Sequence, residues 1–401
     1  MEHYLQRYAE PEVQLLSTWP DLTFNHTLVV PCYREKPDFL PALEREFSGA
    51  GLLLILVINQ PDTDDGDHNG PLLDAIKARE TAIWQSDHLS LRHWGDNGGL
   101  LLVERWRDGL RLPRQQGVGL ARKIGCDIAA QLTFNGCLSS GWMHSTDADT
   151  RLPADYFQGL PDPIERSAAI YPFAHEDGPA LVHRAHRLYE GALQYYVDGL
   201  RWAGSPWAFH TIGSTLAISA HHYCAARGFP RRAAGEDFYL LNKLAKLAPV
   251  TQFRQRGKLV IRARLSQRVP FGTGPATARI AAQLEAGEEP LWYAPQVFSE
   301  LQKFLTIVRN SDPPDTFNEP WAEIPIQLGW SRFVRHCRQQ KLSPEQQQQA
   351  LKHWFDAFRT LRFVHLVQKH LHPPQPLRTL LDNPSPFDHT CQPEKQAISP
   401  N

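Results

Sequence analysis

Two aspartates separated by one residue, Asp147 and Asp149, follow directly on a short β-prone run, Trp142 to Thr146. Carboxylates this close repel each other unless a cation lies between them, so the pair is a candidate oxygen-ligand site for a hard divalent ion. By itself an Asp-x-Asp string is more often a solvated turn, and the chain has two others, Asp62/Asp64 and Asp65/Asp67. The position of Asp147 and Asp149, after a strand and before the turn-forming Arg-Leu-Pro, favours metal binding at this pair.

A second pair of carboxylates, Glu236 and Asp237, stands at the start of a helical pattern. Its apolar stripe is formed by Phe238, Leu241, Leu244 and Leu247. The helix dipole favours ionised carboxylates at this end, which is an ordinary reason to find them there. A carboxylate in this position is also a candidate general base that removes a proton from an acceptor hydroxyl.

Basic side chains open the clearest helix of the chain, GVGLARKIGCDIAAQL. Arg122 and Lys123 lie in its first turns, where a helix N-terminus attracts phosphate. The Gly-x-Gly of this segment lacks both the third glycine of a dinucleotide fingerprint and the Gly-Lys-Ser/Thr ending of a P-loop. An ordinary surface helix start is the alternative interpretation.

Strands that alternate with helices must position these side chains. TLVV, LLLILVI and GWMHST read as buried strands, LSLRHW as a short one, and the segments between them have helical spacing. This alternation predicts an α/β domain with a mainly parallel sheet, in which ligands bind beyond the carboxyl ends of the strands. The predicted strand ends are residues 31–35, 59–62 and 147–149.

Composition limits the class of protein. With 401 residues, 42% hydrophobic and 21% charged, the chain has the composition of a soluble globular protein. Its net charge of −1 argues against a protein held to nucleic acid by bulk charge, although local basic pockets stay open. The longest apolar run is too short for a transmembrane segment, and the six scattered cysteines fit reduced thiols. We therefore predict a cytoplasmic protein.

Five motifs, taken together and in order, resemble the family 2 glycosyltransferases with a GT-A fold. They are VVPCYRE, VINQP, GLARKIGCDIA, STDADT and GSTLAIS…GFP…AGEDFYLLNKL. The resemblance spans residues 25–275 and implies a Rossmann-like GT-A domain there. Residues 1–24 then form a lead-in, residues 276–382 a helical C-terminal region, and the Pro-rich residues 383–401 a tail predicted to be disordered.

The resemblance also implies the ligands. A nucleotide-diphospho-sugar donor, UDP- or GDP-linked, would bind with Mg²⁺ or Mn²⁺ across the strand ends, and an acceptor hydroxyl of unknown identity would be the partner. Asp149 would bind the metal and Asp147 would face the ribose and the metal, while Asp237 would be the general base with Glu236 beside it. The other donor-binding residues implied by position are Pro31, Tyr33, Glu35, Asp62, Arg122 and Lys123.

Two departures from the family pattern leave alternatives open. The usual Gln-x-x-Arg-Trp near the end of the domain is absent, and Arg262, Arg264 and Arg268 are candidates to hold phosphate in its place. An opposed base predicts inversion at the anomeric carbon, whereas a retaining transferase of the mannosylglycerate-synthase type needs no such base. A non-catalytic nucleotide-sugar sensor or scaffold is the third hypothesis. The oligomeric state is not indicated by the sequence.

Overall fold

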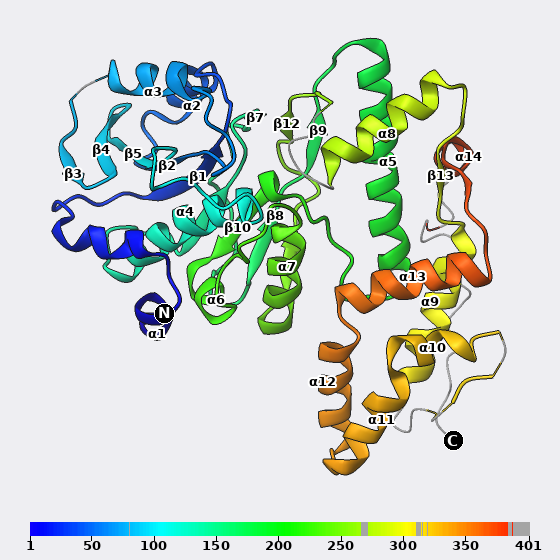
Figure 1. The fold of residues 1–401 in the computed structure, drawn as a ribbon. Helices are drawn as coiled ribbons and strands as arrows, with labels where there is room; N and C mark the ends of the chain where they lie inside the picture. Colours follow the sequence, from blue (N-terminus) through cyan, green and yellow to red (C-terminus); the bar gives the residue numbers. More distant parts are fainter. Residues whose placement is uncertain are drawn as a thin grey trace. The chain divides into compact units, whose positions relative to one another are not determined.

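The computed structural model of the chain describes residues 1–79, 81–265, 272–309, 314, 316–318, 320–383 and 387. It divides into two compact units (Figure 1). The first contains Met1–His183 and Thr211–Ala276, and the second contains Arg184–His210 with the described part of Thr277–Asn401. The predicted contiguous domain of residues 25–275 thus includes a segment, Arg184–His210, whose contacts are with the C-terminal helices.

A nine-stranded sheet forms the centre of the first unit, in the order β11-β8-β10-β6-β1-β2-β5-β4-β3. Its four middle strands are parallel: β6 (Trp142–Ser145), β1 (His26–Cys32), β2 (Leu52–Asn59) and β5 (Gly98–Arg105). On one side the sheet continues through the antiparallel β4 (Leu89–Trp94) and β3 (Trp84–Ser86). On the other side lie β10 (Leu216–Ser219), antiparallel to both its neighbours, then β8 (Ala168–Ile170) and β11 (Val250–Gln252).

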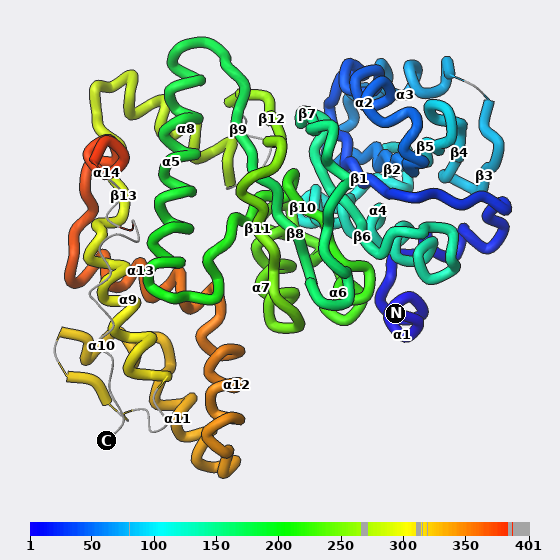
Figure 2. Tube along the Cα trace, turned by 180° about the vertical axis from the view of Figure 1, so that it is seen from behind, coloured from blue at the N-terminus to red at the C-terminus, as the bar shows by residue number. Residues whose placement is uncertain are grey.

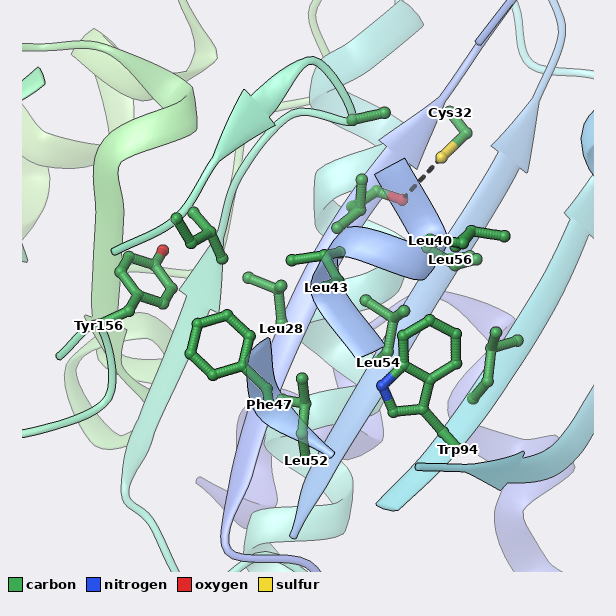
Figure 3. Close-up of a cluster of buried hydrophobic side chains, with 14 of the residues drawn as sticks. Leu28, Cys32, Leu40, Leu43, Phe47, Leu52, Leu54, Leu56, Trp94 and Tyr156 are labelled. Carbon is green, nitrogen blue, oxygen red and sulfur yellow. Dashed lines mark hydrogen bonds between the residues drawn. The ribbon is translucent and has the colours of Figure 1, made fainter. Parts of the chain in front are cut away.

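Burial explains why the parallel strands read as continuous apolar runs. All eight residues of β2 are buried, as expected for a strand covered on both faces. On one face, Leu40, Leu43 and Phe47 of α2 (Phe39–Phe47) pack over Leu28 and Leu54 (Figure 3). On the other, Gly125 of α4 (Gly117–Phe134) approaches so closely that an added Cβ would lie 2.3 Å from Val29 Cγ1. Because successive side chains of a strand alternate between faces, Leu28 and Val29 place α2 and α4 on opposite sides.

The first unit has further helical segments, of which Figure 2 labels α1, α3, α6 and α7. They are α1 (Glu2–Arg7), the 3-10 helix η1 (Pro11–Thr18), α3 (Gly70–Lys77), the 3-10 helix η2 (Gly213–Thr215), α6 (Ala220–Ala225) and α7 (Glu236–Leu247). A small second sheet, in the order β7-β12-β9, is built from β7 (Thr150–Arg151), β12 (Leu259–Ile261) and β9 (Phe173–His175). In it, β12 is antiparallel to β7, and the Arg262 amide donates to the Asp149 carbonyl at 2.9 Å.

The second unit is helical apart from a short pair of strands. Its elements are most of α5 (Ala180–Trp202) and α8 (Thr273–Glu285), then β13 (Leu291–Trp292), α9 (Pro295–Val308), α10 (Glu323–Leu328), α11 (Trp330–Gln339), α12 (Pro344–Trp354), α13 (Ala357–His370), β14 (Gln375–Pro376) and α14 (Leu377–Asp382). Aromatic rings fill its core, and the ring centroids of Phe304 and Phe363 lie 4.8 Å apart with the two ring planes tilted by 32°.

Side-chain caps mark the starts of the two helices α12 and α13. Ser343 and Gln346 form a capping box at the start of α12. Asp356 caps α13 by accepting a hydrogen bond from the Arg359 amide. Of the predicted tail, Asn383 and Phe387 lie among the described residues, and Phe387 is buried against Phe298. Residues 384–386 and 388–401 lie outside them.

The predicted fold class is confirmed: an α/β domain whose large central sheet is parallel in its middle, with a helical C-terminal part. Among the described residues, no helix is both long enough and apolar enough to cross a lipid bilayer.

Candidate active site

Two neighbouring strand ends bring the first group of side chains together. Strands β1 and β6 are parallel partners, so Glu35, shortly after β1, and Asp147, directly after β6, emerge at the same edge of the sheet. Burial raises the pKa of the Cys32 thiol at the end of β1, and the nearby carboxylates of Glu35 and Asp147 raise it further. Two carboxylates, those of Glu35 and Asp147, thus lie near the end of β1.

Arg122 links this edge to the carboxylates of α7. Its guanidinium donates to Glu236 Oε1 at 3.0 Å, to Asp147 Oδ1 at 2.6 Å and to Ser145 Oγ at 2.8 Å. The side chain is only 3% exposed. Burial by itself would lower the pKa of Arg122, but Asp147 and Glu236 raise it above its ordinary value. Arg122 is thus a fixed cation that holds the end of β6 and the start of α7 in one arrangement.

A glycine makes room for this guanidinium. Gly213 lies in η2, and a Cβ built on it would come within 2.8 Å of Arg122 Nη2. The next carbonyl, that of Ser214, accepts a hydrogen bond from Thr146 Oγ1 at 2.9 Å. The Gly-Ser-Thr of the fifth motif therefore packs directly against the end of β6.

Arg264 provides a second cation at the same edge. Its Nη2 atom lies 2.7 Å from Asp149 Oδ2 and 3.0 Å from Glu35 Oε1. The small sheet sets this position, because β12 ends at Ile261, three residues before Arg264, and runs beside β7 just after Asp149. Of the three arginines predicted to hold phosphate, Arg262 instead contacts Glu176 at 3.6 Å, and Arg268 lies outside the described residues.

Glu236 and Asp237 have different surroundings although they are adjacent. Glu236 is buried and its carboxylate accepts from Arg122. Asp237 is half-buried and its Oδ1 accepts from the Phe238 amide at 2.7 Å. Desolvation and the neighbouring Glu236 carboxylate raise the pKa of Asp237 to about 7. A carboxyl group that titrates near neutral pH is suited to proton transfer.

Asp64, which was not among the predicted donor-binding residues, lies on the predicted nucleoside side. Tyr33 donates to Asp64, and Arg34 contacts the same carboxylate at 3.1 Å. Hydrogen bonding from Tyr33 lowers the pKa of Asp64 to about 2. Asp62, the predicted residue, is exposed and accepts from the Arg114 amide at 3.1 Å. Pro31 lies within β1, opposite Val57 of β2.

Lys123 does not join these groups. Its Nζ donates to Asp127 Oδ2 and to Tyr4 OH, each at 2.7 Å, and to the Tyr8 carbonyl. Lys123 and Asp127 are both buried. The structure thus places Lys123 in a network that fastens the N-terminal segment to α4, apart from the carboxylates that Arg122 contacts. The reason is helical periodicity: consecutive side chains on α4 point about 100° apart.

The side chains of the candidate site can be compared with the ligands that a divalent metal ion requires. Within the part of the chain that the structure describes, no group of three or more His, Cys, Asp or Glu side chains is arranged to hold a metal. The carboxylates at the sheet edge are hard oxygen donors, and Mg²⁺ commonly uses one or two of these together with substrate phosphates and water. The carboxylates therefore fit a divalent metal ion whose coordination shell is completed by a phosphate ligand.

Comparisons with known proteins give similarity to solved structures only. No protein-family profile and no curated protein matches the chain. One similar structure is the mannosyltransferase PcManGT from Pyrobaculum calidifontis in complex with GDP-Man and Mn²⁺, at 16% identity and a TM-score of 0.37, covering 95% of this chain and 86% of that one. Another is a mycobacterial protein, at 12% identity and a TM-score of 0.32, covering 72% and 84%.

Proposed function

We propose that this protein is a metal-dependent glycosyltransferase, which transfers a sugar from a nucleotide-diphospho-sugar to an acceptor hydroxyl with inversion. The observation that carries the proposal is the acidic sheet edge organised by two arginines. Among the described residues, Arg122 and Arg264 contact four carboxylates, so these six side chains carry two more negative than positive charges before Asp237 is counted. An anionic diphosphate would be repelled there, so donor binding requires an added cation.

Some residues of the proposed site are held in place by ion pairs, and others are proposed to contact the metal or the sugar donor. Arg122 forms ion pairs with the buried Glu236 and with the partly exposed Asp147, so these three set the geometry of the site. Asp149 carries the metal in the proposal, and Pro31, Tyr33, Glu35 and Asp62 stay proposed for the nucleoside side. When bound, the metal supplies positive charge that stabilises the departing diphosphate.

Asp237 is the general base in this proposal. It accepts the proton of the acceptor hydroxyl while the acceptor oxygen bonds to the anomeric carbon, and the bonding pair to the diphosphate oxygen departs with the leaving group. Glu236 is unsuited to the same task because Arg122 binds its carboxylate. We therefore treat Glu236 as a positioning residue that fixes the first turn of α7.

A donor screen tests the proposal. Thermal shift with UDP- and GDP-sugars, with and without Mn²⁺, should identify a stabilising donor, and product formation with that donor should then be followed. Asp149→Asn should abolish metal-dependent donor binding, and Asp237→Asn should abolish transfer with donor binding retained. Asp177→Asn is the matched control, since its side chain is 98% exposed. Donor binding without hydrolysis or transfer would indicate a sensor, and no binding to any nucleotide sugar with metal present would refute both functions.

A further inference from the structure

Arg264 lies where two carboxylates from different strand ends meet. One nitrogen, Nη2, contacts Asp149 Oδ2 at 2.7 Å and Glu35 Oε1 at 3.0 Å. The Asp149 and Glu35 side chains are 10% and 13% exposed, whereas Arg264 is 33% exposed. Among the described residues, Arg264 Nη2 thus lies between two carboxylates whose side chains are largely buried, and this is the position that a bound cation would also take.

We propose that Glu35 and Asp149 together form the divalent-cation position, and that Arg264 fills this position until metal and donor bind. The inference rests on the proposed function, and it gives Glu35 a role at the metal in place of its predicted role at the nucleoside. It also separates the two aspartates of the Asp-x-Asp pair. In this proposal Asp149 exchanges Arg264 for the metal ion, whereas Asp147 keeps its ion pair with Arg122.

The contrast between the two arginines supports this division. Arg122 is 3% exposed and makes hydrogen bonds with all three of its guanidinium nitrogens, to side chains of Glu236, Ser145 and Asp147. Arg264 reaches both of its carboxylates with Nη2 from a partly exposed side chain. Displacing Arg122 would leave the buried carboxylate of Glu236 without its ionic partner, which is energetically costly. Arg264 can instead move into solvent, where water hydrates its charge.

Charge balance explains why exchange would accompany donor binding. Replacing a monovalent guanidinium with a divalent ion adds one positive charge at Asp149 and Glu35, and the released Arg264 remains close by. Both changes reduce the excess of negative charge that opposes a diphosphate. A guanidinium can also bind phosphate oxygens in a bidentate manner, so Arg264 is placed to contact the donor once it leaves the carboxylates.

Direct Mn²⁺ binding tests the exchange without any measurement of activity. Free Mn²⁺ is measured by electron paramagnetic resonance during titration of the full-length wild type and of four variants in the absence of nucleotide. Arg264→Gln should bind Mn²⁺ at least about tenfold more tightly than the wild type, because a competing charge in contact with the ligands is removed. Glu35→Gln and Asp149→Asn should each weaken binding by about tenfold or more. Arg262→Gln is the matched control, because it removes the same charge two residues away from a side chain that is 53% exposed and faces Glu176.

Each outcome has one meaning. Equal affinities of Arg264→Gln and Arg262→Gln would show that Arg264 does not compete with the metal, and an unchanged affinity of Glu35→Gln would remove Glu35 from the site. Mn²⁺ binding to none of the proteins would overturn the inference, with donor turnover still deciding the proposed function. If Arg264→Gln unfolds, Arg264→Met replaces it: this variant also removes the charge and should bind Mn²⁺ more tightly than the wild type, and an affinity equal to that of Arg262→Gln contradicts competition.

Discussion

Removal of Arg122 should cost a large part of the stability of the first unit. In Arg122→Met the buried Glu236, whose side chain is 6% exposed, loses its ionic partner at 3.0 Å, and Asp147 loses its partner at 2.6 Å. Breaking a buried ion pair by removing one partner destabilises a protein by about 3–5 kcal/mol. Since a folded domain is typically stable by about 5–15 kcal/mol, the variant should be close to unfolding in mild denaturant. Loss of the ion pair with Asp147 lowers the free energy of unfolding by less, because the Asp147 side chain is 40% exposed and water can solvate it.

The assay is chemical denaturation followed by circular dichroism, with hydrogen exchange of α4 peptides to localise the change. Glu236→Gln in the Arg122→Met background should recover more than half of the lost free energy of unfolding, because it removes the unpaired buried charge. The control is Arg262→Met, whose exposed ion pair at 3.6 Å should contribute less than about 1 kcal/mol. A loss below about 1 kcal/mol for Arg122→Met, or no recovery in the double variant, would refute the view that Arg122 is a fixed structural cation.

Three further predictions concern Asp237, Tyr33 and Tyr4. Because Asp237 must be ionised to accept a proton and its pKa is raised to about 7, kcat/KM should fall about tenfold per pH unit below that value, and a flat profile would contradict its role as the base. Tyr33→Phe should raise the pKa of Asp64 from about 2 toward 3.8, measurable by carbon NMR titration. A depressed carboxyl pKa stabilises the fold above the unfolded value and this contribution disappears as pH falls through the folded value, so the variant should lose less stability in acid than the wild type. Tyr4→Phe removes a 2.6 Å hydrogen bond to buried Asp127 and should destabilise the protein by about 1–3 kcal/mol, with the donor KM unchanged.

The apolar runs of the sequence determined most of the sheet. The LLLILVI run is the core of β2 and LSLRHW is β4 with its predicted bounds, since fully buried strands require uninterrupted apolar residues or clear alternation. One central strand, Gly98–Arg105, was not singled out despite its own apolar run. It follows closely on β4, and two adjacent runs joined by a short turn are difficult to separate by periodicity alone. In the fold it is the parallel neighbour of β2.

The identities of the acidic groups could also be read from the sequence, because strand ends and helix starts are local features. The sequence did not indicate which arginine pairs with which acidic group. Arg122 reaches Glu236 across 114 positions, and Arg264 reaches Glu35 across 229. No local pattern fixes contacts at such separations, since they depend on which strands become neighbours in the sheet.

Arg122 and Lys123 show most clearly what the sequence determined and what only the tertiary structure decided. Their sequence determined that both lie in the first turns of a helix, and their types made both candidates for binding phosphate. Only the packing of α4 between one face of the sheet and the N-terminal segment decided that Arg122 meets Asp147 while Lys123 meets Asp127 and Tyr4. A rotation of about 100° per residue separates the two side chains, so the surroundings of the helix, and not its sequence, assign one to the candidate site and the other to the scaffold.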